Sequence, residues 1–96
     1  MIEILIRREI LKAIEWLGGS PKLLASLRGA SKRRLYDALE LLGADRELLA
    51  TVGSWLDTWT DDQVLTALRE WNARAAADVL EKLRQGHGAM KPAAKA

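Results

Sequence analysis

Apolar side chains recur along this chain at intervals of three and four residues, the spacing that places them on one face of a helix. In the first segment Ile6, Ile10 and Ile14 follow one another in this way, and Gly18 and Gly19 end the pattern. The spacing predicts a helix over residues 2–17. No stretch shows the sustained apolar and polar alternation of a half-buried strand, so we predict an all-α fold.

Two shorter helices are predicted between residues 20 and 43. Ser20, followed by Pro21, begins the first of them and Ser31 begins the second. A serine hydroxyl at this position accepts a hydrogen bond from a free N–H of the first helical turn, and proline fits the position after it. Gly29 and Gly43 close the two helices.

The rest of the chain predicts two more helices and a tail. Asp45 begins a fourth helix, and its apolar stripe is Leu48, Val52, Trp55 and Trp59. A fifth helix, residues 60–85, has the stripe Val64, Leu68, Trp71, Ala75, Val79 and Leu83. Residues 86–96 show no periodicity, so we expect a disordered tail. The prediction is one small five-helix bundle over residues 1–85 with a long C-terminal helix.

Composition narrows the chemistry that the chain can carry out. It has no Cys, and its single His, His87, lies between two glycines in the tail. Motifs for a phosphate-binding loop or a nucleophile elbow are missing. Asp57 and Asp61 lie four residues apart, but capping and solubility explain such carboxylates better than a metal does. We therefore expect no catalysis, no metal and no cofactor.

The N-terminus predicts a protein that does not enter a membrane. Residues 1–11 are apolar but are interrupted by Glu3, Arg7, Arg8 and Glu9. This pattern fits neither a signal peptide nor a membrane span. Together with the absence of Cys, which fits a reducing compartment, it leads us to expect a cytoplasmic protein.

The strongest functional pattern is a helix-turn-helix over residues 20–43. Ala25 supplies a small residue where two helices would cross, and Gly29, four residues later, would supply a positive φ in the turn. Leu35 and Leu39 would anchor the second helix in the core. Ser31 would cap that helix, so that its first turn could face a phosphate or a base edge.

The segment GSPKLLASLRGASKRRLYDALELLG resembles the helix-turn-helix of Fis-type proteins, a nucleoid and enhancer-binding family. The positions in register are Gly19, Ala25, Gly29, Ser31, Leu35, Tyr36, Leu39, Leu42 and Gly43. With the preceding helix, the resemblance covers residues 10–43. It implies a homodimer whose second motif helix lies in the major groove of DNA. It also implies that Ser31, Lys32, Arg34, Tyr36 and Asp37 face the DNA.

The distribution of charge favours the same partner. The net charge of the whole chain is only +2, but residues 1–43 carry eight basic and five acidic side chains. Basic residues cluster on the motif, as expected of a protein that neutralises phosphates. We expect Lys22, Arg28 and Arg33 to contact phosphates, and Lys32, Arg34 and Tyr36 to reach base edges or sugars of double-stranded DNA.

The C-terminal half suggests a surface for a second chain. Its fifth helix is longer than a bundle of this size needs, and tryptophan is favoured at interfaces. The expected interface is Trp55, Trp59, Val64, Leu68, Trp71 and Ala75; the alternative is that these side chains form the core. Two functions stay open. One is a homodimeric DNA-binding protein that regulates transcription or shapes DNA; the other is a helical adaptor or inhibitor that binds a protein and not DNA.

Overall fold

A computed structural model of the chain describes residues 2–57 and 62–95, with side chains described for residues 2–57 and 62–86. Within these ranges the chain forms helices and no strand, which confirms an all-α bundle of five helices. The helices are α1 (Ile2–Trp16), α2 (Pro21–Leu27), α3 (Lys32–Leu41), α4 (Arg46–Asp57) and α5 (Asp62–Lys95). Trp59 and Thr60, the residue at which the sequence begins the fifth helix, lie outside the described residues.

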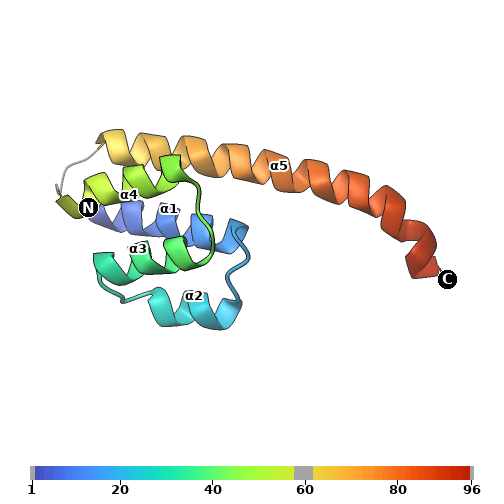
Figure 1. Cartoon of the computed structure of the whole chain (residues 1–96), viewed down its shortest axis with the longest axis horizontal. Coiled ribbons are helices and arrows are strands. Elements are labelled where there is room, and N and C mark those ends of the chain that lie inside the picture. The colour runs from blue at the N-terminus through green and yellow to red at the C-terminus, as the bar shows by residue number, and fades with distance from the viewer. Residues whose placement is uncertain (1, 58–61, 96) are drawn as a thin grey trace.

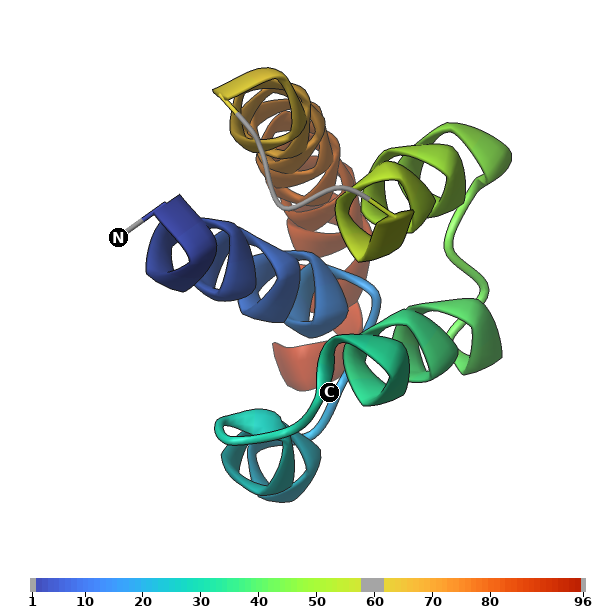
Figure 2. The ribbon, with the colours of Figure 1, turned by 90° about the vertical axis from the view of Figure 1, so that its left-hand side faces the viewer.

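Four of the helices enclose the core, and α2 lies outside this ring. Seen end-on, α1, α5, α4 and α3 follow one another around the core (Figure 2). Helix α2 packs mainly against α1, at the edge of the molecule that α3 also borders. The C-terminal part of α5 extends well past the other helices (Figure 1), and the molecule is accordingly 52 Å long but only 25 and 23 Å across.

The core consists of the apolar stripes that the sequence predicts. Ile6, Ile10 and Ile14 of α1 are fully buried, and so are Leu35 and Leu39 of α3. From α4 and α5 the buried side chains are Leu48, Val52, Trp55, Val64, Leu65, Leu68 and Trp71. Burial of large apolar side chains from four helices is the main stabilising contribution in a domain of this size.

Two glycines end α1 because each meets a different steric demand. Gly18 has φ +100°, a conformation in which a side chain is strained. The N–H of Gly19 donates to the carbonyl of Ile14 at 2.8 Å, and the N–H of Gly18 donates to Glu15 at 3.0 Å. These bonds satisfy the last carbonyls of the helix. A Cβ on Gly19 would lie 2.6 Å from Ile14 Cγ2, so a larger residue there would force neighbouring atoms to shift.

The predicted caps begin the helices where the sequence places them. Ser20 accepts from the N–H of Leu23 at 3.1 Å, and Ser31 accepts from the N–H of Arg34 at 3.2 Å. Asp45 Oδ1 accepts from the N–H of Leu48 at 2.7 Å. The second oxygen of Asp45 also accepts from Trp71 Nε1 at 2.9 Å, which joins the start of α4 to α5. One carboxylate thus caps a helix and fixes a tertiary contact.

The turn between α2 and α3 differs from the predicted one. Among the described glycines, only Gly18 and Gly43 have a positive φ, so the expectation for Gly29 is wrong. Arg28 is in the right-handed helical region, and the N–H of Ala30 donates to Leu27 at 3.1 Å. This closes an ordinary turn that needs no left-handed residue. Ala25 is exposed rather than placed at a helix crossing, because α2 packs mainly on α1.

The fifth helix is longer than its apolar stripe. The sequence predicts an end at Gln85 and a disordered tail, whereas α5 continues to Lys95. The predicted end at Gln85 rests on the glycines and the proline that follow and on the loss of periodicity. A glycine weakens a helix by about 1 kcal/mol without ending it. Alanines at 89, 93 and 94 favour the helical continuation, and Pro92 opposes it. The side chains of His87, Lys91 and Lys95 lie outside the described ones.

A buried polar contact fastens α1 to α5. Glu9 and Asn72 are each only 6% exposed. The side-chain amide of Asn72 donates to the carboxylate of Glu9 at 2.8 Å and to its backbone carbonyl at 2.9 Å. Lys12 and Arg69 lie 3.6 and 3.8 Å from the other carboxylate oxygen. Buried polar groups of this kind are costly unless paired, so the contact specifies how the two helices align.

Candidate nucleic-acid interface

The start of α3 is the part of the predicted motif that the structure reproduces most closely. Ser31 is exposed and caps the helix, and Leu35 holds its first turn against the core with no exposed surface. The first turn therefore presents its free N–H groups at the surface, where the helix dipole favours a negative charge. No acidic residue lies in this first turn. The geometry suits a phosphate better than it suits a cation.

Three exposed cations of the α2–α3 region form no ion pair within the described part of the chain. We call Lys22, Arg28 and Arg34 the open cations. They lie on α2, at its C-terminal cap and on α3. All three are exposed, and their side chains have no hydrogen bond or ion pair with the residues that the structure describes. Their positive charge is available to an outside partner.

Three other residues that the sequence predicts to contact DNA contact one another instead. Arg33 Nε lies 3.3 Å from Asp37 Oδ1, and the Arg33 guanidinium lies 5.6 Å from the centre of the Tyr36 ring. The other side of Tyr36 faces α4, since a Cβ on Gly53 would be 3.9 Å from its Cε2. The outer side of α3 is thus a paired patch of mixed charge rather than a row of cations.

Lys32 is placed differently from its prediction. The sequence predicts that it reaches a base edge, but its ammonium lies 5.7 Å from the centre of the Trp55 ring on α4. Half-buried and directed at an aromatic face, it makes a cation–π contact within the chain. The direction follows from helix geometry. Lys32 lies one turn before Leu35 and two before Leu39, close to the buried side of α3.

Sequence reasoning missed one arginine that holds the motif in place. Arg7 of α1 donates through Nη1 to the carbonyl of Ala30 in the turn between α2 and α3. Its Nη2 also lies 3.7 Å from Glu3. The N-terminal pattern gave Arg7 only as an interruption of an apolar stretch. Its contact joins positions 23 residues apart, which no local signal reveals.

The predicted interface residues lie in the core of the chain itself. Trp55 and Leu68 have no exposed surface, and Val64 and Trp71 are 4% and 9% exposed. Ala75 packs partly buried against them. The four buried side chains belong to the core, which is the alternative that the sequence leaves open, and the interface prediction is wrong for them. Ala75 keeps part of its surface exposed, and Trp59 lies outside the described residues. Helices α1 and α4 of the same chain cover the apolar stripe of α5. Among the side chains described on α5, the large apolar ones that are exposed are Leu80 and Leu83, at 66% and 60%.

Other kinds of site find no support in the described part of the chain. No group of three or more His, Asp or Glu side chains there could hold a metal ion. None of the helices described combines the length and the apolar character needed to cross a membrane. Comparison with family models, curated proteins and solved structures found no match to this chain. The Fis-type resemblance of residues 10–43 therefore stays a prediction.

Proposed function

We propose that this protein binds double-stranded DNA through the start of α3 and the open cations Lys22, Arg28 and Arg34. The observation that carries the proposal is that these exposed cations have no partner in the described chain, while most cations elsewhere are paired. Phosphate neutralisation by Lys and Arg supplies most of the affinity of such complexes. The expected outcome of binding is regulation of transcription or a change in DNA architecture.

Each part of this surface has a distinct task. Lys22 and Arg28 contact phosphates and fix the position of α3 on the duplex. The capped first turn of α3 adds N–H donors to a phosphate oxygen. Arg34 is the residue of α3 best placed to reach a base edge, because Lys32 and Arg33 are engaged within the chain.

The test compares two single variants of equal charge. Arg34→Ala removes an open cation, and Arg46→Ala removes an exposed arginine at the start of α4 that also has no partner among the described residues. We expect Arg34→Ala to weaken binding to a labelled duplex of about 30 base pairs by roughly fivefold, or about 1 kcal/mol. Arg46→Ala should change it little. Equal affinities for wild type and Arg34→Ala would contradict the assignment.

We further propose that two copies associate through the overhanging part of α5. Leu80 and Leu83 lie three residues apart on this helix and are largely exposed. The charged side chains beside them are two acidic and two basic, Asp78, Glu81, Lys82 and Arg84. Two copies of this surface therefore meet without net repulsion. A dimer would set two α3 helices at a fixed spacing, as two half-sites on DNA require.

The oligomeric state tests this second part separately. Light scattering after size exclusion should give twice the chain mass of 10.7 kDa for the wild type. Leu80→Glu with Leu83→Glu should give a monomer, and Leu41→Glu, at a site 87% exposed on α3, should stay dimeric. A wild-type monomer at tens of micromolar would contradict the dimer and leave the DNA proposal standing.

A further inference from the structure

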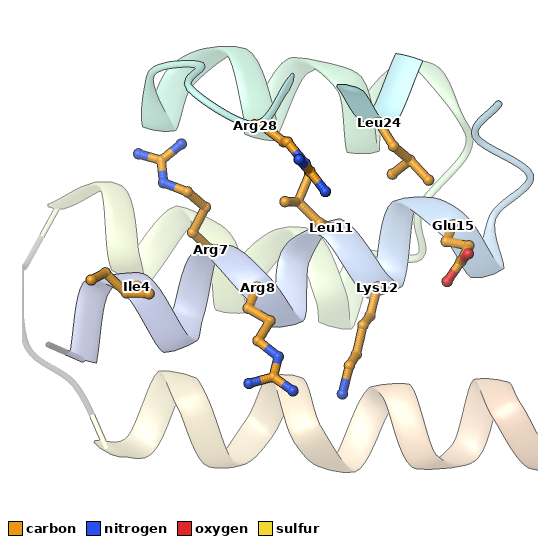
Figure 3. A pocket seen from close by; sticks show the side chains of 8 residues that line it. All are labelled: Ile4, Arg7, Arg8, Leu11, Lys12, Glu15, Leu24 and Arg28. Atoms are coloured by element: carbon orange, nitrogen blue, oxygen red, sulfur yellow. The ribbon is translucent and has the colours of Figure 1, made fainter. Parts of the chain in front are cut away.

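Helix α1 also carries apolar side chains to one side of the stripe that it buries. Ile6, Ile10 and Ile14 are fully buried, whereas Ile4 is 65% exposed and Leu11 is half-buried against the edge of the core. Leu11 is partly buried and lies beside Leu24 of α2 at the floor of a groove between the two helices (Figure 3). The fold leaves this groove open.

Cationic residues of α1 and α2 border this groove. Arg7, Arg8 and Lys12 of α1 and Arg28 from the end of α2 line it, with Glu15 as the single acidic residue. Figure 3 shows Arg28 and Leu24 reaching from α2 toward Leu11, while Arg8 and Lys12 extend from the flank of α1 toward α5. Arg7 and Lys12 have partners within the chain. Arg8 and Arg28 have none among the described residues.

We propose that this groove binds an acidic amphipathic helix of a protein partner. Its apolar floor of Ile4, Leu11 and Leu24 fits the apolar face of a helix, whose anchors recur at every third and fourth residue. The cations at the rim fit acidic residues that flank such anchors. An exposed isoleucine among arginines gains nothing from a DNA backbone, since phosphates do not bury it. The groove is therefore distinct from the DNA surface and meets it only at Arg28.

The probe for this site is a labelled peptide of about 16 residues, since shorter isolated helices are marginal. It carries Leu at helical spacing on one face and Glu elsewhere. One control peptide has Lys in place of Glu. A second control has the same composition with the Leu residues moved off a common face. Binding is followed by fluorescence anisotropy, and the amides that shift are mapped by NMR.

Two substitutions at exposed positions test the groove without threatening the fold. Arg8→Glu reverses one rim charge, and Ile4→Ser removes an apolar contact at the floor. Each should weaken binding of the acidic peptide about tenfold, a loss typical of one removed charged or apolar contact. The matched controls are Arg46→Glu on α4 and Leu41→Ser on α3, which should leave affinity unchanged. Amide shifts should fall on α1 and α2.

Each other outcome would overturn the proposal. The proposal is wrong if the acidic peptide fails to bind at millimolar concentration, or if the rearranged peptide binds as tightly as the acidic one. It is also wrong if the groove variants bind the peptide like their controls. A DNA duplex whose binding depends on Ile4 and Arg8 as strongly as the peptide would make the groove part of the nucleic-acid surface instead. Because Arg34 lies outside the groove, a failure here leaves the DNA proposal intact.

Discussion

The cations of α5 and the open cations of α2 and α3 differ in how the fold uses them. On α5, Arg69 approaches Glu9, Arg74 forms an ion pair with Glu47 at 2.8 Å, and Lys82 pairs with Asp78. On α2 and α3 the open cations Lys22, Arg28 and Arg34 pair with nothing that the structure describes. The first group is used within the fold. The second group is left exposed and is available for binding.

This difference shows why net charge is a poor guide to function here. A total of +2 is too small to indicate a nucleic-acid partner. What distinguishes the α2–α3 region is the number of its cations that no carboxylate neutralises. Substitutions that separate an effect on stability from an effect on DNA binding therefore test the comparison between the two groups of cations.

The comparison treats α2 and α3 as part of the same folded unit as the other helices. Leu35→Asp tests this, and it has the largest expected effect. Leu35 is fully buried among helices α1, α3 and α4, so a carboxylate there should cost more than about 4 kcal/mol. Thermal unfolding followed by circular dichroism should show loss of the whole cooperative transition. The control Leu41→Asp, on an 87% exposed site of the same helix, should melt like wild type. Loss of α3 alone would contradict the account.

A second prediction sharpens the role of pairing on α5. Asn72→Ala removes the amide that donates to the buried Glu9, so stability should fall by about 1–3 kcal/mol. Arg74→Ala removes an exposed ion pair with Glu47 and should cost less than about 1 kcal/mol. Urea denaturation measures both. Equal losses would mean that burial does not decide which contacts hold α5 on its neighbours α1 and α4.

A third prediction concerns the turns that flank α2. Gly19→Ala places a Cβ 2.6 Å from Ile14 Cγ2 and 2.9 Å from its carbonyl oxygen. The overlap should cost about 1–3 kcal/mol in denaturant unfolding. Gly29→Ala meets nothing within 4 Å at a φ that is not positive, so it should be neutral or stabilise by up to about 1 kcal/mol. A marked loss of stability in Gly29→Ala would instead support the positive φ that the sequence predicts at Gly29.

The smallest effect on stability is expected for the open cations themselves. Replacing Lys22, Arg28 or Arg34 by Ala removes no hydrogen bond or ion pair of the side chain within the described chain. Each change should therefore alter the free energy of unfolding by less than about 0.5 kcal/mol, as is usual at such surface sites. A larger loss in denaturant unfolding would mean that the residue is part of the fold rather than free for a partner.

Local signals in the sequence predicted the helices and their caps well. Ser20, Ser31 and Asp45 act within one turn of themselves, and Gly18 and Gly43 have the left-handed conformation that ends a helix. The turn at Gly29 was predicted wrongly because it depends on where α2 packs. Helix α2 lies against α1, and this leaves Ala25 exposed and removes the need for a positive φ.

The candidate sites were predicted less completely, because they depend on contacts between distant residues. Sequence could not show that Lys32 turns to Trp55, or that Arg7 reaches Ala30. The sequence shows the apolar stripe with its tryptophans, but it does not show that α1 and α4 bury this stripe. It therefore does not decide between an interface and the core. The groove beside α1 has no signal in the sequence, because it forms only where Leu24 and Arg28 of α2 come to lie beside α1.

The most direct test of the central claim is the salt dependence of DNA binding in two triple variants. One replaces Lys22, Arg28 and Arg34 by Ala, and the other replaces Arg46, Arg74 and Lys82, so both lose three positive charges. Anisotropy is measured with one duplex between about 50 and 200 mM salt. The account predicts that the first variant loses about 0.9 of log–log salt slope per lost phosphate contact, while the second keeps the wild-type slope. Equal slopes for the two variants, or no binding by wild type, would contradict it.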